Sequence, residues 1–139
     1  MLSADAIARV TGLSTFYASG TGAVENFSHC VVTKSAESSE RVRLEIELDD
    51  PAVPSVQELE NAKAADKGVS LPGELGPGYS AILKDADGRP SGAYVSAWTS
   101  DGTKTLSIRL YQGAPGRDHQ ADVVEFVRQL RPVLLDPKT

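Results

Sequence analysis

Residues 93–111 read Ala-Tyr-Val-Ser-Ala-Trp-Thr-Ser-Asp-Gly-Thr-Lys-Thr-Leu-Ser-Ile-Arg-Leu-Tyr, a pattern that predicts a β-hairpin. Asp101-Gly102 is a favoured two-residue loop, because a type I′ turn requires positive φ at both central positions. A four-residue loop from Ser100 to Thr103 would leave the same side chains on each face of the hairpin. Either loop aligns apolar residues on one face: Val95 with Ile108, Ala97 with Leu106, and Ala93 with Leu110. A slip of one residue would turn this face outward, so the register is well specified.

The other face of the hairpin is mixed, with Tyr94, Trp98 and Arg109 among small polar residues. Aromatic residues and arginine are enriched at binding hot spots, which makes these three candidate binding residues. The alternative is that a helix covers the aromatic rings and that Arg109 lies across one of them. Both interpretations stay open at the level of sequence.

The order of elements predicts an α+β fold: an antiparallel sheet with helices packed on it, in the order αβββαβββα. The expected elements outside the hairpin are helices over Leu2–Leu13, Val56–Lys67 and Asp118–Arg131, and strands over Ser14–Gly22, Asn26–Lys34, Arg41–Leu48 and Tyr79–Lys84. Ser3 and the Ser55–Glu58 capping box begin the first two helices, and Gly12 ends the first. Pro132 is expected to end the last helix.

Bulk composition fits one globular domain over residues 1–135, followed by a frayed tail over 136–139. The chain has 139 residues, 40% apolar and 24% charged, with a net charge of −5. Without a basic cluster, nucleic acid and anionic membrane surfaces are unexpected partners. No apolar run reaches about 18 residues, so nothing is predicted to span a bilayer. The single Cys30 excludes an internal disulfide and a cysteine-cluster metal site.

The sequence offers no convincing reaction centre, so no catalytic residue, metal or cofactor is predicted. His29 and Cys30 are neighbours on one strand and point to opposite faces, while His119 begins the last helix and is expected to be exposed. The glycines Gly20 and Gly22 lack the Lys-Ser/Thr of a phosphate loop, and the segment 85–90 lacks calcium-loop spacing and predicts a plain turn. Cys30 is expected to act as a small buried hydrophobic residue.

The loop Val69–Gly78 is dense in glycine and proline, and such loops often carry function. It adds Leu75 and Tyr79 to the candidate binding residues, as an alternative or a supplement to the hairpin face.

Three pieces of the chain carry a resemblance: the opening segment Leu2–Gly12, the strand triplet His29-Cys30-Val31, and the strand entry Leu75–Tyr79. Together with the final hairpin and helix, they resemble the ectodomains of an actinobacterial lipoprotein family of unknown function. The element order is similar to the sandwich of Mog1 and PsbP, a likeness of fold that implies no function. Family members often pair the strand cysteine with a second cysteine, which this chain lacks.

The resemblance implies a non-catalytic, extracytoplasmic binding or sensor domain, held at the cell surface by a lipid on a cysteine preceding Met1. Its partner would be an unknown protein or small molecule of the envelope. The segment Leu2–Gly12 is interrupted by polar residues and does not itself read as a signal peptide. The alternative is a small cytosolic enzyme or chaperone-like protein with a site built from loops.

Overall fold

The computed structural model describes residues 3–13, 17–20, 29–33 and 42–135 of the chain. In order, its elements are α1 (Ala4–Thr11), β1 (Tyr17–Gly20), β2 (His29–Thr33), β3 (Arg43–Asp49), α2 (Val56–Ala65), β4 (Val69–Ser70), the 3-10 turn η2 (Gly73–Leu75), β5 (Gly78–Lys84), β6 (Pro90–Trp98), β7 (Thr105–Tyr111) and α3 (His119–Leu134). The predicted outer ends of the first two strands and the tail over 136–139 lie outside the described residues.

The strands form one antiparallel sheet in the order β1-β2-β3-β7-β6-β5-β4. The predicted α+β class, an antiparallel sheet with helices, is therefore confirmed. Two meanders, β1–β3 and β4–β7, meet where β3 pairs with β7 along seven residues, from Arg43 opposite Tyr111 to Asp49 opposite Thr105. The two-residue strand β4 was not predicted, because it is too short to show a pattern of alternation.

The register of the β6–β7 hairpin is confirmed, with Ala93 opposite Leu110, Val95 opposite Ile108 and Ala97 opposite Leu106. The prediction of a type I′ turn is wrong. Such a turn requires positive φ at both central residues, and only Gly102 has it, whereas Asp101 does not. The loop instead has four residues, closed by a bond of 3.1 Å from the Thr99 amide to the Lys104 carbonyl. Asp101 stabilises it by accepting hydrogen bonds from the hydroxyls of Thr99 and Thr103, both at 2.7 Å.

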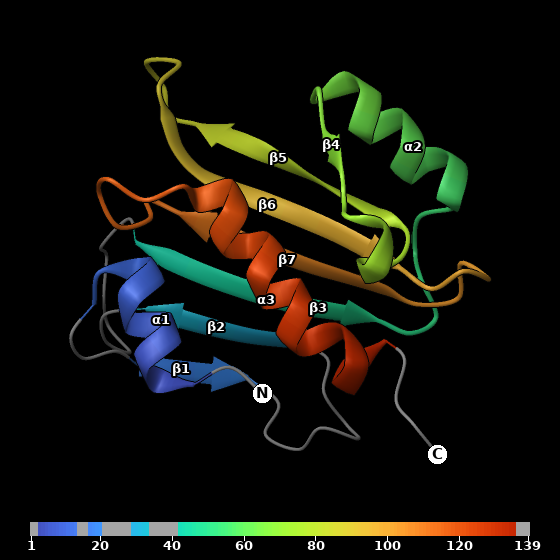
Figure 1. The fold of residues 1–139 in the computed structure, drawn as a ribbon, viewed down its shortest axis with the longest axis horizontal. Helices are drawn as coiled ribbons and strands as arrows, with labels where there is room; N and C mark the ends of the chain where they lie inside the picture. The colour runs from blue at the N-terminus through green and yellow to red at the C-terminus, as the bar shows by residue number, and fades with distance from the viewer. Residues whose placement is uncertain (1–2, 14–16, 21–28, 34–41, 136–139) are drawn as a thin grey trace.

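The main core lies between the sheet and the helices α1 and α3, which cross one face of it (Figure 1). Cross-strand pairing extends the apolar rows of the hairpin into β3, where Leu44 lies opposite Leu110 and Ile46 opposite Ile108. The buried side chains that α3 contributes are Val123, Phe126, Val127, Leu130 and Leu134. Polar contacts of α3 add to this packing, since Gln120 donates to the Ser80 hydroxyl at 2.9 Å and Arg131 to the Trp98 carbonyl at 2.8 Å.

Among the described residues, α2 is the helix that lies on the opposite face of the sheet, where it packs over β5 and β6. A second, smaller core joins Leu59 of α2 to Tyr79, Ala81 and Trp98 of the sheet. Leu59 is the one residue of α2 that is buried, at 8% exposure. The part of this face formed by β3 and β7 has no helix over it among the described residues.

The predicted helix caps are confirmed. Ser3 accepts a bond from the Ala6 amide at 3.1 Å, and Gly12 ends α1 in the left-handed region with φ 78°. The Ser55–Glu58 capping box of α2 is present with both of its hydrogen bonds. None of the described helices has the length and apolar composition that crossing a bilayer requires.

The predicted end of the last helix at Pro132 is wrong, since Pro132 lies inside α3. A proline in a helix loses one hydrogen bond and crowds the carbonyl four residues earlier. Here the following residues Leu134 and Leu135 are buried against the main core, at 4% and 3% exposure. Their burial stabilises the last turn, which continues with a bond from the Leu135 amide to the Arg131 carbonyl.

Candidate functional site

A groove of about 570 Å³ runs along the half-covered face of the sheet, between α2 and β3. Its apolar wall comes from α2 and the segment before it, through Val53, Pro54, Leu59 and Ala62. Its opposite wall is acidic and consists of Glu47 and Asp49 on β3. The floor is polar, formed by hydroxyls and one arginine of β6 and β7: Tyr94, Ser96, Thr105, Ser107 and Arg109.

Antiparallel pairing arranges these residues in rows across the sheet. One row runs from Asp49 through Thr105 to Trp98, and a second joins Glu47 to Ser107 and Ser96. A third row joins Glu45, Arg109 and Tyr94. Residues directly opposite each other have Cβ atoms about 5 Å apart, so each row places its side chains in contact range.

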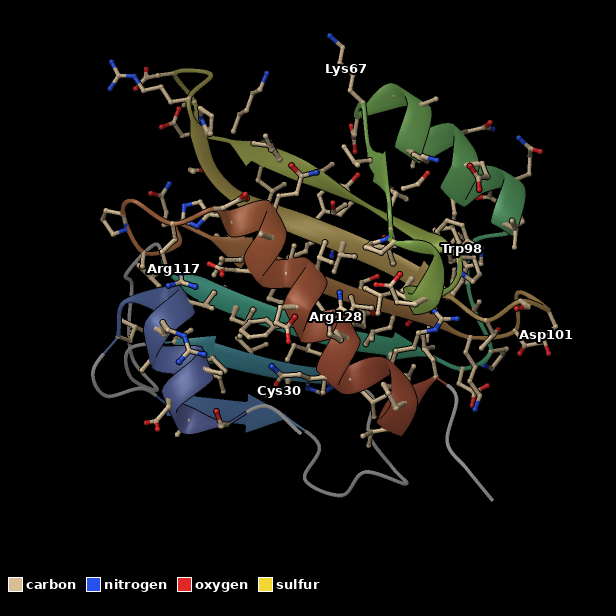
Figure 2. The ribbon with its side chains drawn as sticks, viewed as in Figure 1. Cys30, Lys67, Trp98, Asp101, Arg117 and Arg128 are labelled. Atoms are coloured by element: carbon tan, nitrogen blue, oxygen red, sulfur yellow. The ribbon has the colours of Figure 1, made fainter. Side chains whose placement is uncertain are left out.

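Three of the five predicted binding residues, Tyr79, Tyr94 and Arg109, line this groove. Trp98 does not, because it is buried at 4% exposure in the small core beneath α2. The helix α2 therefore covers the rings of Trp98 and Tyr79, as the second interpretation predicts. Tyr94 is half-buried and Arg109 is exposed. Figure 2 shows Asp101 at the tip of the β6–β7 loop and Trp98 nearer the body of the fold.

Leu75 does not share the groove. It is buried at 6% exposure in the main core, on the other side of the sheet. The buried guanidinium of Arg131 holds the loop around it, donating to the Trp98 carbonyl at 2.8 Å and the Pro77 carbonyl at 3.4 Å. The predicted binding loop is thus anchored in the main core through Leu71 and Leu75, while residues between and before them, Val69 included, are exposed.

A tyrosine pair connects the groove floor to the end of α2. The hydroxyl of Tyr94 donates to the carboxylate of Asp66 and lies 3.0 Å from the hydroxyl of Tyr79. The two rings meet edge to face, with centroids 5.7 Å apart. Burial, followed by the bond to Asp66, raises the pKa of Tyr94, because both favour the protonated phenol. The Tyr94 hydroxyl is therefore protonated and acts as a hydrogen-bond donor over the physiological pH range.

Glu47 and Asp49 follow each other on the same face of β3, close enough for their side chains to hydrogen-bond. Partial burial, followed by the negative charge of Asp49, raises the pKa of Glu47. Arg109 acts in the opposite direction, but less strongly. The neighbouring Glu45 is instead engaged by Arg43, whose Nε lies 2.7 Å from its carboxylate. Across the β2–β3 ladder, His29 is the register partner of Glu47.

Thr105 lies at the floor of the groove with 2% exposure, opposite Asp49 on β3 and Trp98 on β6. Its hydroxyl is buried and has no hydrogen-bond partner among the described residues. Buried polar groups are rarely left unpaired, so this hydroxyl calls for an explanation.

The residues weighed for catalysis do not converge. His29 is exposed, whereas the neighbouring Cys30 packs against the main core, as predicted from their alternation. Burial raises the pKa of the Cys30 thiol, which disfavours its reactive thiolate. The prediction that His119 is exposed is wrong: the residue is half-buried, and a side chain on Gly113 would collide with its ring. In the part of the chain described, no group of three His, Cys, Asp or Glu is placed to hold a metal ion.

The sequence reasoning missed Glu47, Asp49, Asp66 and Thr105. The alternation within Arg41–Leu48 predicts one face of mixed charge, with Arg43, Glu45 and Glu47, and such a face is typical of a surface in water. The signal that could have identified the groove is the thin apolar stripe of α2, because such a helix covers only part of a sheet face. No sequence pattern identifies Asp66, because its role is to accept a hydrogen bond from Tyr94, which lies 28 residues away in the sequence.

Comparison of the chain with protein-family models, with curated proteins and with solved structures finds no match, so its site is interpreted from its own geometry alone.

Proposed function

We propose that this chain is a non-catalytic binding domain and that the groove between α2 and β3 is its ligand site. The observation that carries the proposal is the groove itself, in which an apolar wall faces two carboxylates across a floor of hydroxyls and Arg109. Its volume is in the range of small-molecule sites, about 300–1,000 Å³. Apolar walls with a few convergent polar groups are the usual composition of such sites.

We further propose that the domain works outside the cytoplasmic membrane, as the ectodomain of a lipoprotein with a Mog1/PsbP-like sandwich. The support for this is the similarity of Leu2–Gly12, His29-Cys30-Val31 and Leu75–Tyr79 to that family, together with the succession of helices and strands. The expected ligand is then a small molecule or a protein segment of the cell envelope. A direct test is the codons upstream of Met1, where this proposal requires a hydrophobic leader ending in a lipid-acceptor cysteine.

The second candidate is a small cytosolic enzyme or chaperone-like protein. The observation in its favour is the Glu47–Asp49 pair, because the raised pKa of one carboxyl beside a second carboxylate is a common feature of acid–base sites. The enzyme would place its chemistry on β3 rather than in a loop.

The binding proposal is tested by hydrogen exchange of the purified chain with and without the small-molecule fraction of an envelope extract. We expect slower exchange in α2, because a ligand bridging α2 and the sheet opposes opening of the helix. Arg109→Ala should abolish this protection. Arg128→Ala is the matched control, since Arg128 is also an exposed arginine but lies on α3, where it pairs with Glu74 and Glu125. Unchanged exchange with the extract, or equal loss in the two variants, would contradict the proposal.

A further inference from the structure

We propose that the β3 side of the groove binds the primary ammonium group of a small alkylamine, with Glu47, Asp49 and Thr105 as its acceptors. This inference rests on the proposed function and deepens it, because it names the chemical class of the ligand. The alkyl part of the ligand would lie along Leu59 and Ala62 of α2.

The β3 wall of the groove is acidic. Glu47 and Asp49 lie side by side on β3, and the charge of Asp49 makes ionisation of Glu47 less favourable. Glu45, on the same face, has its own cation in Arg43. Arg109 lies in the row of Glu45 and Tyr94, whereas Glu47 and Asp49 belong to the next two rows along the strand. A cationic group between the two carboxylates would relieve their repulsion.

The hydroxyl of Thr105 gives an observation independent of the acidic pair. Thr105 is the register partner of Asp49, so its side chain lies on the same face next to that carboxylate. It lines the groove at 2% exposure and its Oγ1 lacks a partner among the described residues. A ligand group seated against Asp49 is placed to supply that partner, with a small shift of the groove floor.

The number of donors on the ligand head matches the acceptors of the site. A primary ammonium group carries three N–H donors in a compact head, which matches two carboxylates and one hydroxyl. A divalent ion such as Ca²⁺ takes about six to eight oxygen ligands, more than these three residues provide. The apolar wall of the groove, through Leu59 and Ala62, is suited to methylene groups rather than to a hydrated ion.

The test is an NMR titration of isotope-labelled chain with n-pentylamine at about pH 8, where a primary alkylamine is protonated. The same titration with 1-pentanol and with CaCl₂ provides the uncharged and the hard-cation comparison. Glu47→Gln and Asp49→Asn should weaken pentylamine binding about tenfold or more, and Thr105→Val about threefold. Glu45→Gln is the matched control on the same face of β3 and should change affinity less than about twofold.

Saturable pentylamine shifts at Asp49 and Thr105 that Glu47→Gln abolishes would support the inference, and Asp49→Asn repeats the test if Glu47→Gln fails to fold. The absence of saturable shifts, equal shifts with 1-pentanol or CaCl₂, or equal weakening by Glu45→Gln would overturn it. The envelope-extract experiment separates the two proposals. If the extract protects α2 but pentylamine does not bind, the proposal of a binding domain is retained and only the proposal of an alkylamine ligand is rejected.

Discussion

The hydroxyl of Tyr94 should hold α2 against the sheet, and Tyr94→Phe tests this with the loss of one oxygen atom. The substitution removes the hydrogen bonds to Asp66 and Tyr79 but keeps the ring and its edge-to-face contact with Tyr79. Since Leu59 is the one buried residue of α2, the hydroxyl is a large share of what fixes this helix. We therefore expect the variant to loosen α2 while the main core stays intact.

The expected magnitude follows from the partners of the hydroxyl. A hydrogen bond to a charged group contributes about 1.5–3 kcal/mol. Asp66 is exposed, so solvent screening brings the value to the lower end of this range, about 1.5 kcal/mol. This free energy corresponds to an increase of about tenfold in the equilibrium constant for opening of α2.

Native-state hydrogen exchange measures this opening directly. The reporters are the amides of Leu59 and Asp66, which donate to the carbonyls of Ser55 and Ala62 at 3.0 and 2.9 Å. Both should exchange about tenfold faster in Tyr94→Phe, and the amides of β7 should change much less. Tyr111→Phe is the control for loss of a tyrosine hydroxyl elsewhere on the sheet. Unchanged exchange in α2, or equal acceleration in α2 and β7, would refute the reasoning.

The pH dependence of the same contact has a defined sign. Because the pKa of Tyr94 is raised in the folded chain, its contribution to stability is complete below the ordinary tyrosine pKa, about 10, and is lost as the pH rises above it. The difference in unfolding free energy between the parent chain and Tyr94→Phe should therefore shrink from about pH 9 to pH 11. Urea denaturation at several pH values checks this, and a constant difference would contradict it.

Three further predictions concern other parts of the fold. Gly92→Ala should destabilise the chain by about 3 kcal/mol or more in urea denaturation, because its new Cβ would lie 1.9 Å from a backbone oxygen of β7, whereas Gly73→Ala, with open space around it, should be nearly neutral. NMR titration of the Asp101 carboxyl should give a pKa of about 2, since the hydroxyls of Thr103 and Thr99 hydrogen-bond its ionised form, and Thr103→Ala should raise it. Cys30 should react slowly with iodoacetamide at neutral pH and rapidly once urea unfolds the chain, because burial raises its thiol pKa.

The fold was predictable where the sequence pattern and the packing express the same constraint. The facing of the hairpin follows from Leu106, Ile108 and Leu110, because a slip of one residue would expose all three. The extent of α3 was not predictable from Pro132, because burial of Leu134 and Leu135 outweighs the local preference of proline to end a helix. Whether burial or the proline preference prevails depends on packing with residues distant in sequence, which no local pattern contains.

The candidate site was predictable in part. Tyr94 and Arg109 were found because large aromatic and guanidinium side chains are conspicuous on a strand face. Leu75 was predicted from its place in a glycine-rich loop, but its side chain packs into the main core, and Arg131 donates a hydrogen bond to Pro77 of the same loop. Glu47 and Asp49 are ordinary on a solvated strand. They become a site only because α2 stops short of them, and that depends on tertiary structure.

The seam between β3 and β7 has a consequence for how the chain reaches its native state. Each meander can form from neighbouring segments, but the seam joins Asp49 to Thr105 and must close a long intervening stretch of chain. Closing such a loop costs entropy before any distant contact compensates it, which slows folding. We expect the meander β4–β7 with α3 to assemble first and β1–β3 to dock onto the edge of β7 afterwards. A chain halted between these steps would display that bare edge of β7, and so the seam is where misassembly between two copies would begin.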